Sequence, residues 1–380
     1  MIISDQEVIS LEDAQYAAQY FIDYYTGMNG DITTYMRMNK LASMDLRSNT
    51  LPDMGPEEDM FSDFTMRPED MEISIEECPM SKFVYYINTI SSHINEASVP
   101  GKVMLLIVRE KQTGKMVGLI RLGSPSINSK PRNQWLGTPL DSMNADMMHR
   151  FNQSVMMGFV IVPTQPFGYN YLGGKLLAAI CCTHEVREMV NKKWGRDICA
   201  FETTSLYGSS KTASQYDGMK PFLRFTGLTE SNFVPMIMGE KFQFIHDWFR
   251  DKVGGELIDP KATSKKMKQQ SRMVKIMKKS LGDDPLQQQL EDALQIGLDM
   301  QEQKRSFVST YGHTGVPEFL SMKTDSINRA ENYDRFYLEN VLAWWNKKAT
   351  KRYDALVSDG RLRTRLETWT CNPEEIDIIR

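Results

Sequence analysis

The chain has 380 residues, of which 41% are hydrophobic and 25% charged, with a formal net charge of −4. These proportions are typical of a folded globular protein and exclude a disordered or fibrous chain. The longest apolar stretches have strand length, far below the roughly 20 residues that span a bilayer. The N-terminus lacks a basic patch followed by an apolar block. We therefore expect a cytoplasmic protein without a membrane partner, and five scattered cysteines predict no disulfide framework.

Residues 1–100 predict a helical and acidic N-terminal region. Helices are expected over 11–27, which ends at a glycine, over 31–49, which opens on an aspartate cap, and over 81–95. The stretch between the second and third of these is rich in acids and prolines and predicts a loop or a loosely packed arm. Its carboxylates are Asp53, Glu57, Glu58, Asp59, Asp63, Glu69, Asp70, Glu72, Glu76 and Glu77.

Residues 101–235 carry the β-strand signals. Two apolar runs around the turn "KQTGK" predict a hairpin, and "VMMGFVIVP" (155–163) predicts a buried strand. A glycine-containing turn, a helix over 172–194 and strands at "DICAFETTS" and "PFLRFTGLTE" follow. This order predicts an α+β fold whose mixed sheet has one parallel pair joined by a crossover helix.

Residues 236–380 predict a C-terminal region that is helical throughout. Within it, residues 261–282 hold eight basic side chains and no acidic one. Such a run predicts a nearby anion, because like charges on one helix repel each other. We expect DNA to be that anion, bound by Lys265, Lys266, Lys268, Arg272, Lys275, Lys278 and Lys279. Docking on the acidic stretch 53–77, a solvated face and a membrane-surface helix are the alternatives.

Two further features of the chain have more than one interpretation. The stretch "FGYNYLGGKLLA" (167–178) invites a phosphate-loop interpretation, but its lysine comes one place late and no hydroxyl follows. The string "CCTH" offers Cys181, Cys182 and His184, which is half of a zinc site at most, and we predict no metal. Trp344 and Trp345 lie in a predicted helix where at least one would face a partner in a homodimer.

The segment from about 103 to 229 resembles the acetyltransferase superfamily with the general-control N-acetyltransferase (GNAT) fold. The resemblance rests on "MVGLIRLGSP", "FVIVP", "LGGKLLA", "AFETTS" and "FLRFTG". Closer still, the segment is similar to the Druantia anti-phage protein A-like domain and to phage Mom-like DNA-modification proteins. This implies a GNAT-like core in a bacterial host cell. It also implies a cradle for acetyl-CoA or another acyl donor at Asn170, Gly173, Gly174 and Lys175. The alternative is that these glycines only allow close packing.

The candidate catalytic residues follow the second parallel strand. Glu202 lies where open sheets present ligand-binding groups and would act as a general base, with an ion pair or a helix cap as its structural alternative. Ser205 would bind a phosphate or orient a substrate, and Tyr207 would donate a proton or stack on a base. The resemblance implies that Tyr216 is the general acid.

Three functions follow from these features. The leading one is a phage-related, nucleic-acid-directed GNAT-like protein that transfers a small group to a DNA base. The second is a non-enzymatic DNA-binding component of a phage or anti-phage system. The third is a small-molecule N-acyltransferase, which would leave the basic run unexplained.

Overall fold

The computed structural model describes residues 3–45, 66–90, 101–205, 214–233, 235–262, 265–300, 302–364 and 367–369. The chain divides into two compact units. Unit 1 consists of Met1–Ser48 and Phe233–Gln301, and unit 2 of Asn49–Asn232 and Glu302–Arg380. Each unit therefore combines segments that are far apart in the sequence. The predicted boundaries at residues 100 and 235 instead divide the chain into three consecutive regions.

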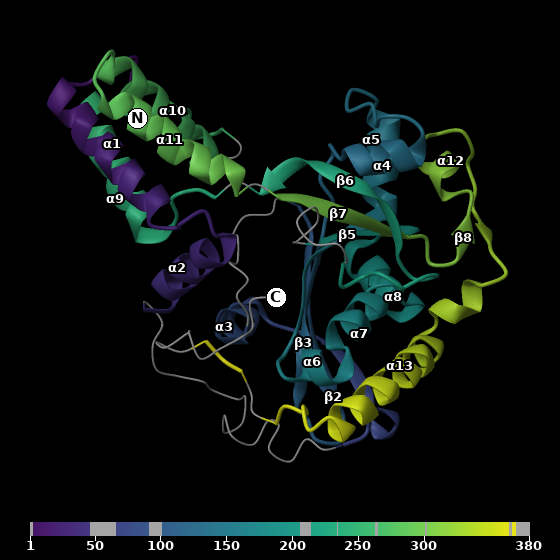
Figure 1. Cartoon of the computed structure of the whole chain (residues 1–380). Coiled ribbons are helices and arrows are strands. Elements are labelled where there is room, and N and C mark those ends of the chain that lie inside the picture. The colour runs from purple at the N-terminus through teal and green to yellow at the C-terminus, as the bar shows by residue number, and fades with distance from the viewer. Residues whose placement is uncertain are drawn as a thin grey trace. The chain divides into compact units, whose positions relative to one another are not determined.

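Unit 1 is a helical unit, as Figure 1 shows. Its helices are α1 (Leu11–Thr26), α2 (Ile32–Asp45), α9 (Gly239–Val253), α10 (Lys265–Leu281) and α11 (Leu286–Asp299). The predicted starts are confirmed: the Ser10 hydroxyl caps α1, and the Asp31 carboxylate accepts two backbone N–H groups at the start of α2. Helix α1 packs closely on α11, since a Cβ at Gly297 would come within 2.7 Å of the Tyr25 ring.

Unit 2 is built on a seven-stranded mixed sheet. The strand order is β1-β2-β3-β4-β5-β7-β6. The bounds are β1 (Ile73–Glu77), β2 (Val103–Glu110), β3 (Met116–Gly123), β4 (Val155–Pro163), β5 (Ala200–Ser205), β6 (Arg224–Phe233) and β7 (Glu302–Ser309). The predicted hairpin is β2 and β3, and the predicted parallel pair is β4 and β5. The α+β class with a mixed sheet is thus confirmed.

Helices cover both faces of this sheet (Figure 1). One face carries α7 (Gly173–Ile180), α8 (His184–Trp194) and α13 (Leu338–Ser358), whose apolar residues share one core with Phe201 and Phe307 of the sheet. The other face carries α4 (Lys130–Leu136), α5 (Ala145–Ser154) and α12 (Val316–Leu320), packed around Val155 and Ala200. The remaining elements of unit 2 are η1 (Pro68–Asp70), α3 (Met80–Ile90), α6 (Phe167–Tyr171), β8 (His313–Thr314), β9 (Asn328–Arg329) and η2 (Tyr333–Phe336).

Three predicted elements differ from the structure. The helix expected over 172–194 is two helices, because Thr183 caps α8 by accepting a hydrogen bond from the Val186 amide. Strand β1 lies in the acidic stretch that predicted a loop or arm. Strands β7, β8 and β9 interrupt the C-terminal region that was expected to be helical throughout, although α10, α11 and α13 confirm its helical character elsewhere.

Trp345 is a core residue of unit 2. It is 1% exposed, its Nε1 donates to the Tyr171 carbonyl at 2.7 Å, and its ring stacks on Phe167. Trp344 packs against Phe222 with ring centroids 5.0 Å apart. Trp345 therefore does not face a partner chain, whereas Trp344 is only half-buried, and a homodimer stays a prediction. Among the helices described, none is long and apolar enough to cross a membrane.

Candidate functional site

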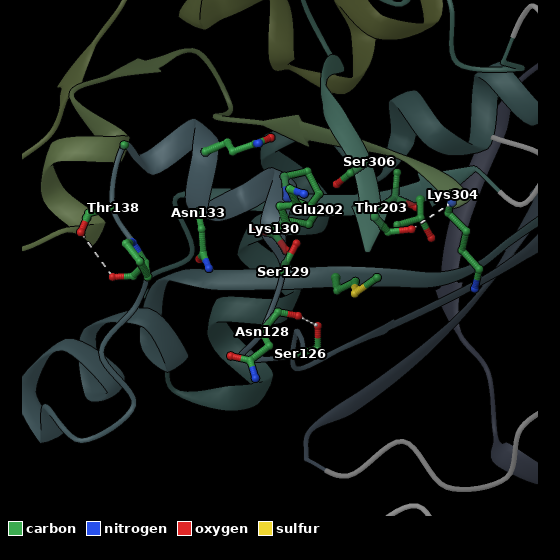
Figure 2. Close-up of a pocket in the computed structure, with 17 residues that line it drawn as sticks. Ser126, Asn128, Ser129, Lys130, Asn133, Thr138, Glu202, Thr203, Lys304 and Ser306 are labelled. Carbon is green, nitrogen blue, oxygen red and sulfur yellow. Dashed lines mark hydrogen bonds between the residues drawn. The ribbon is translucent and has the colours of Figure 1, made fainter. Parts of the chain in front are cut away.

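A pocket opens in unit 2 where the parallel pairing of β4 and β5 ends. The last paired residues are Gly158 and Thr203, and β4 has an irregular register with β3 nearby. The pocket has a volume of about 820 Å³ and lies between the strand ends and the loop that leads into and out of α4 (Figure 2). Its lining residues are Ser126, Asn128, Ser129, Lys130, Pro131, Asn133, Gln134, Gly137, Thr138, Pro139, Met157, Glu202, Thr203, Thr204, Thr229, Lys304 and Ser306.

Glu202 lies in this pocket and forms an ion pair with Arg132. The Arg132 Nε lies 2.8 Å from a Glu202 carboxylate oxygen, and the two residues are 2% and 7% exposed. Arg132 is fixed from other sides as well: it donates to the carbonyls of Ser126 and Ile127, and its guanidinium lies 4.5 Å from the centre of the Phe151 ring. The prediction of an ion pair for Glu202 is confirmed, and the same side chain faces a pocket.

Burial controls the electrostatics of this pair. It raises the pKa of Glu202 above its usual value, and the charge and hydrogen bonding of Arg132 only partly oppose that shift. Burial likewise lowers the pKa of Arg132. Lys130 and Lys304 add two cations to the lining. The charged side chains of the lining are thus two lysines and one carboxylate that is paired with Arg132, and this balance suits an anionic or partly anionic ligand.

The rest of the lining is largely polar. Figure 2 shows Ser126, Asn128 and Ser129 on the loop before α4, Asn133 on α4, and Ser306 on β7 around the same space as Glu202. Hydroxyl and amide groups can donate and accept hydrogen bonds, and they fix the orientation of a polar ligand. Met157 and the two prolines are the apolar part of the lining.

The predicted catalytic acid and base are not brought together. Side chains alternate along a strand, and Glu202 points to the face that carries α4 and α5. Tyr216 is buried in the core of the opposite face, where its ring contacts Phe307 with centroids 5.3 Å apart. Burial also raises the pKa of Tyr216 well above its usual value. The structure therefore places Glu202 and Tyr216 on opposite faces of the sheet, and their roles as base and acid stay predictions.

Of the other two residues of the predicted catalytic set, Ser205 alone lies within the described residues. Ser205 is buried, and the alternation along β5 places it on the face of Phe201 and Thr203, away from Glu202. Tyr207 lies outside the described residues.

The predicted acyl-donor cradle is occupied by contacts within the chain. The Asn170 side chain donates to the Arg363 carbonyl at 2.6 Å and accepts from the Arg363 amide at 3.2 Å. The Lys175 ammonium donates to the Asp217 carbonyl. A Cβ at Gly173 would meet the Phe167 ring at 2.7 Å, so this glycine is required for close packing. Gly174 has more room, since its nearest neighbour would be the Gln215 side chain at 3.6 Å.

The basic run forms α10 of unit 1, and several of its cations already have partners. Glu7 pairs with Arg272, Lys275 and Lys279, and Glu291 pairs with Lys278. Hydrogen bonding and charge of Lys279 and Lys275 lower the pKa of Glu7 to about 2. Lys266 lies over the Phe242 ring, and Lys265 and Lys268 are exposed. The carboxylates that pair with the basic run, Glu7 and Glu291, thus come from outside residues 261–282. DNA binding by α10 stays a prediction.

The acidic stretch predicted as a docking partner of the basic run belongs to unit 2, not to unit 1. Of its described members, Glu69 pairs with Arg67, Glu72 with Lys111 and Glu77 with Lys193. Its acids between residues 53 and 63 lie outside the described residues.

The cysteines next to His184 are core residues. Burial raises the pKa of Cys182 to about 12 and that of Cys181 further, so both are thiols at neutral pH. Within the described residues, no group of three His, Cys, Asp or Glu side chains is arranged to hold a metal ion.

Sequence reasoning identified Glu202 but missed its neighbours in the pocket. Arg132 and Lys130 lie in the Pro-, Asn- and Ser-rich segment 125–139, where no periodicity marks a buried residue. Lys304 comes from β7, which the sequence did not predict as a strand. The one available signal was the pair of basic residues around Pro131 in an otherwise uncharged segment.

Comparison with known proteins gives one match. Residues 62–211 match the family described as DruA: Druantia protein DruA. No curated protein and no solved structure matches the chain. The matched segment runs through the end of β5 and contains Arg132, Lys130 and Glu202, while Lys304 lies beyond it. The Druantia-like part of the resemblance is therefore supported, and the segment that forms most of the pocket is similar to Druantia protein DruA.

Proposed function

We propose that this chain is a nucleic-acid-binding component of an anti-phage defence system and that its unit 2 pocket holds a nucleotide. The similarity of residues 62–211 to Druantia protein DruA supports the defence role. The observation that carries the nucleotide is the buried carboxylate of Glu202, which is paired with Arg132 and lines a polar pocket that also contains two lysines.

The pocket matches a nucleotide in size and chemistry. Its volume of about 820 Å³ lies within the range of small-molecule sites. Lys130 and Lys304 supply positive charge for a phosphate. Asn133 and Gln134 offer amides, which pair well with adenine, and Glu202 offers a carboxylate, which accepts a hydrogen bond from the amino group of cytosine. Arg132 acts as a positioning residue, because it holds the carboxylate in place.

Binding without group transfer fits this geometry better than transfer to a base. A transferase would need an acid near Glu202, and the predicted acid, Tyr216, is buried on the other face of the sheet. The raised pKa of Glu202 would suit a general base, but a base alone does not complete the reaction. We therefore favour the binding component over the enzyme.

The test is the affinity of the full chain for a fluorescent single-stranded DNA oligonucleotide across a salt series. Changing both Lys130 and Lys304 to alanine should weaken binding by about tenfold or more and flatten the salt dependence. Lys192→Ala, which removes an exposed lysine from α8, is the matched control and should bind like the wild type. Glu202→Gln should change the preference among bases while it leaves the salt dependence intact. Wild-type affinity in the double lysine variant would refute the pocket as the nucleotide site.

A further inference from the structure

A second group of cationic side chains gathers around Tyr333, away from the pocket. Arg187 of α8 donates to the Tyr333 hydroxyl at 3.3 Å and lies 3.4 Å from the His313 Nε2. Arg329 of β9 lies over the Tyr333 ring at 4.4 Å, and the His184 ring stacks against the same tyrosine at 4.1 Å. Four residues that are, or can become, positively charged therefore surround one phenol.

Among the residues that the structure describes, neither Arg187 nor Arg329 forms an ion pair with a carboxylate, and the Arg187 Nε is buried without a hydrogen-bond partner. An unpaired buried donor costs free energy unless a ligand satisfies it. The His184 ring differs: its Nε2 faces the Tyr333 carbonyl and therefore carries the proton, so its buried Nδ1 is an acceptor without a partner. The two arginines are thus short of negative charge and of acceptors.

The pKa values of both histidines are lowered, first by burial and then by nearby positive charge. Burial lowers the pKa of His184 to about 4 and also lowers that of His313, and Arg187 and Arg329 add to both shifts. The backbone carbonyls of Tyr333 and Thr310 oppose these shifts, and Asp197 partly opposes the shift at His313. A bound anion would oppose the lowering of both histidine pKa values by Arg187 and Arg329.

The backbone holds this group together at a conformational cost. Tyr311, over whose ring Arg187 lies, has φ of +52°, a left-handed conformation that is uncommon for a non-glycine residue. The next residue, Gly312, has φ of +75°, and a Cβ there would come within 2.6 Å of the Tyr333 Cα. This close approach places His313 beside Tyr333. The strained turn therefore brings β8 onto η2 and forms the cationic group.

We propose that Arg187, Arg329, His313 and the Tyr333 hydroxyl form a phosphate-binding site. Arginine binds phosphate oxygens with paired, charge-assisted hydrogen bonds, and a tyrosine hydroxyl can donate another. The phosphate comes either from a small phosphorylated molecule or from a nucleic-acid backbone. This site is independent of the proposed nucleotide pocket, since the two share no residue.

The test compares two probes, inorganic phosphate and a DNA duplex, on the full chain. Phosphate binding is followed by calorimetry and by the NMR shift of the His313 ring, and DNA binding by fluorescence anisotropy. The variant is Arg329→Gln, because Arg329 is exposed and its loss should not unfold the chain. Arg335→Gln removes an exposed arginine from η2 and is the matched control.

Wild type and Arg335→Gln should bind phosphate alike, and Arg329→Gln should bind it about tenfold more weakly. That result assigns the site to a small phosphorylated ligand. Loss of affinity for the duplex alone in Arg329→Gln would assign it to a nucleic-acid backbone. If Arg329→Gln equals the wild type with both probes, the site does not exist. Changing Lys130 and Lys304 of the pocket to alanine should leave the NMR shift of the His313 ring unchanged, whichever source of phosphate the site binds.

Discussion

Arg132 and Glu202 form an ion pair that is almost completely removed from solvent, with Nε and carboxylate oxygen 2.8 Å apart. One partner comes from the short helix α4 and the other from the parallel strand β5. Desolvation of two charges is costly, and a buried pair is often no more stable than a neutral replacement. Stability alone therefore does not account for the pair, whose carboxylate lines the pocket proposed to bind a nucleotide.

The pH dependence of stability should report this pair. The pKa of Glu202 is raised in the folded chain, so its contribution to stability is fully present below the unfolded pKa and is lost as the pH rises through the folded pKa. In Glu202→Gln no carboxyl group titrates at this position, so this loss of stability does not occur. The free energy of unfolding of the wild type, relative to Glu202→Gln, should therefore fall as the pH rises from about 4 towards neutrality. Denaturant titrations at several pH values measure it, and a difference that grows with pH would show that attraction to Arg132 dominates.

Removal of the arginine should be far more damaging than removal of the carboxylate charge. Arg132→Met leaves Glu202 buried without a cation, which costs about 3–5 kcal/mol at neutral pH. The double variant Arg132→Met with Glu202→Gln should recover much of that loss, because no buried charge is then left unpaired. Chemical denaturation of the four proteins gives the coupling energy. Additive effects would mean that the two side chains do not interact.

The two glycines at the start of α7 should respond differently to the same change. Gly173→Ala places a Cβ against the Phe167 ring and the Gly168 backbone, and should destabilise unit 2 by about 1–3 kcal/mol. Gly174→Ala meets only the Gln215 side chain at ordinary contact distance and should be neutral or slightly stabilising. Thermal unfolding distinguishes them. Equal tolerance at both positions would remove the packing explanation for Gly173.

Helix α13 should depend on Trp345 as a core residue. Trp345→Ala removes a buried indole and its hydrogen bond to the Tyr171 carbonyl, at a cost of about 3–5 kcal/mol. Val357→Ala on the same helix is the control, since Val357 is 51% exposed and should change stability by less than about 0.5 kcal/mol. A stable Trp345→Ala chain that loses self-association would instead favour the predicted partner-facing role.

The sequence predicts those parts of the fold that local patterns define. Continuous apolar runs marked β2, β3 and β4, a glycine marked the end of α1, and a capping aspartate marked the start of α2. Strand β7 was missed because "EQKRSFVS" begins with five polar residues, and its pairing with β5 comes from tertiary contacts.

The candidate site was predictable only in part. Glu202 follows from its place on the second parallel strand. The place of Arg132 does not follow from the sequence, because no periodic pattern in its Pro- and Ser-rich segment indicates which residue will contact a distant strand. The position of Tyr216 in the core of the opposite face could not be predicted either, because the sequence does not specify which face of the sheet this residue covers.

The most direct test of the central claim is a crystal structure of the full chain with a short single-stranded oligonucleotide. The account predicts one nucleotide in the unit 2 pocket, with a phosphate near Lys130 or Lys304 and the edge of the base against Glu202. An oligonucleotide bound elsewhere, such as along α10, with no nucleotide in the pocket would contradict it.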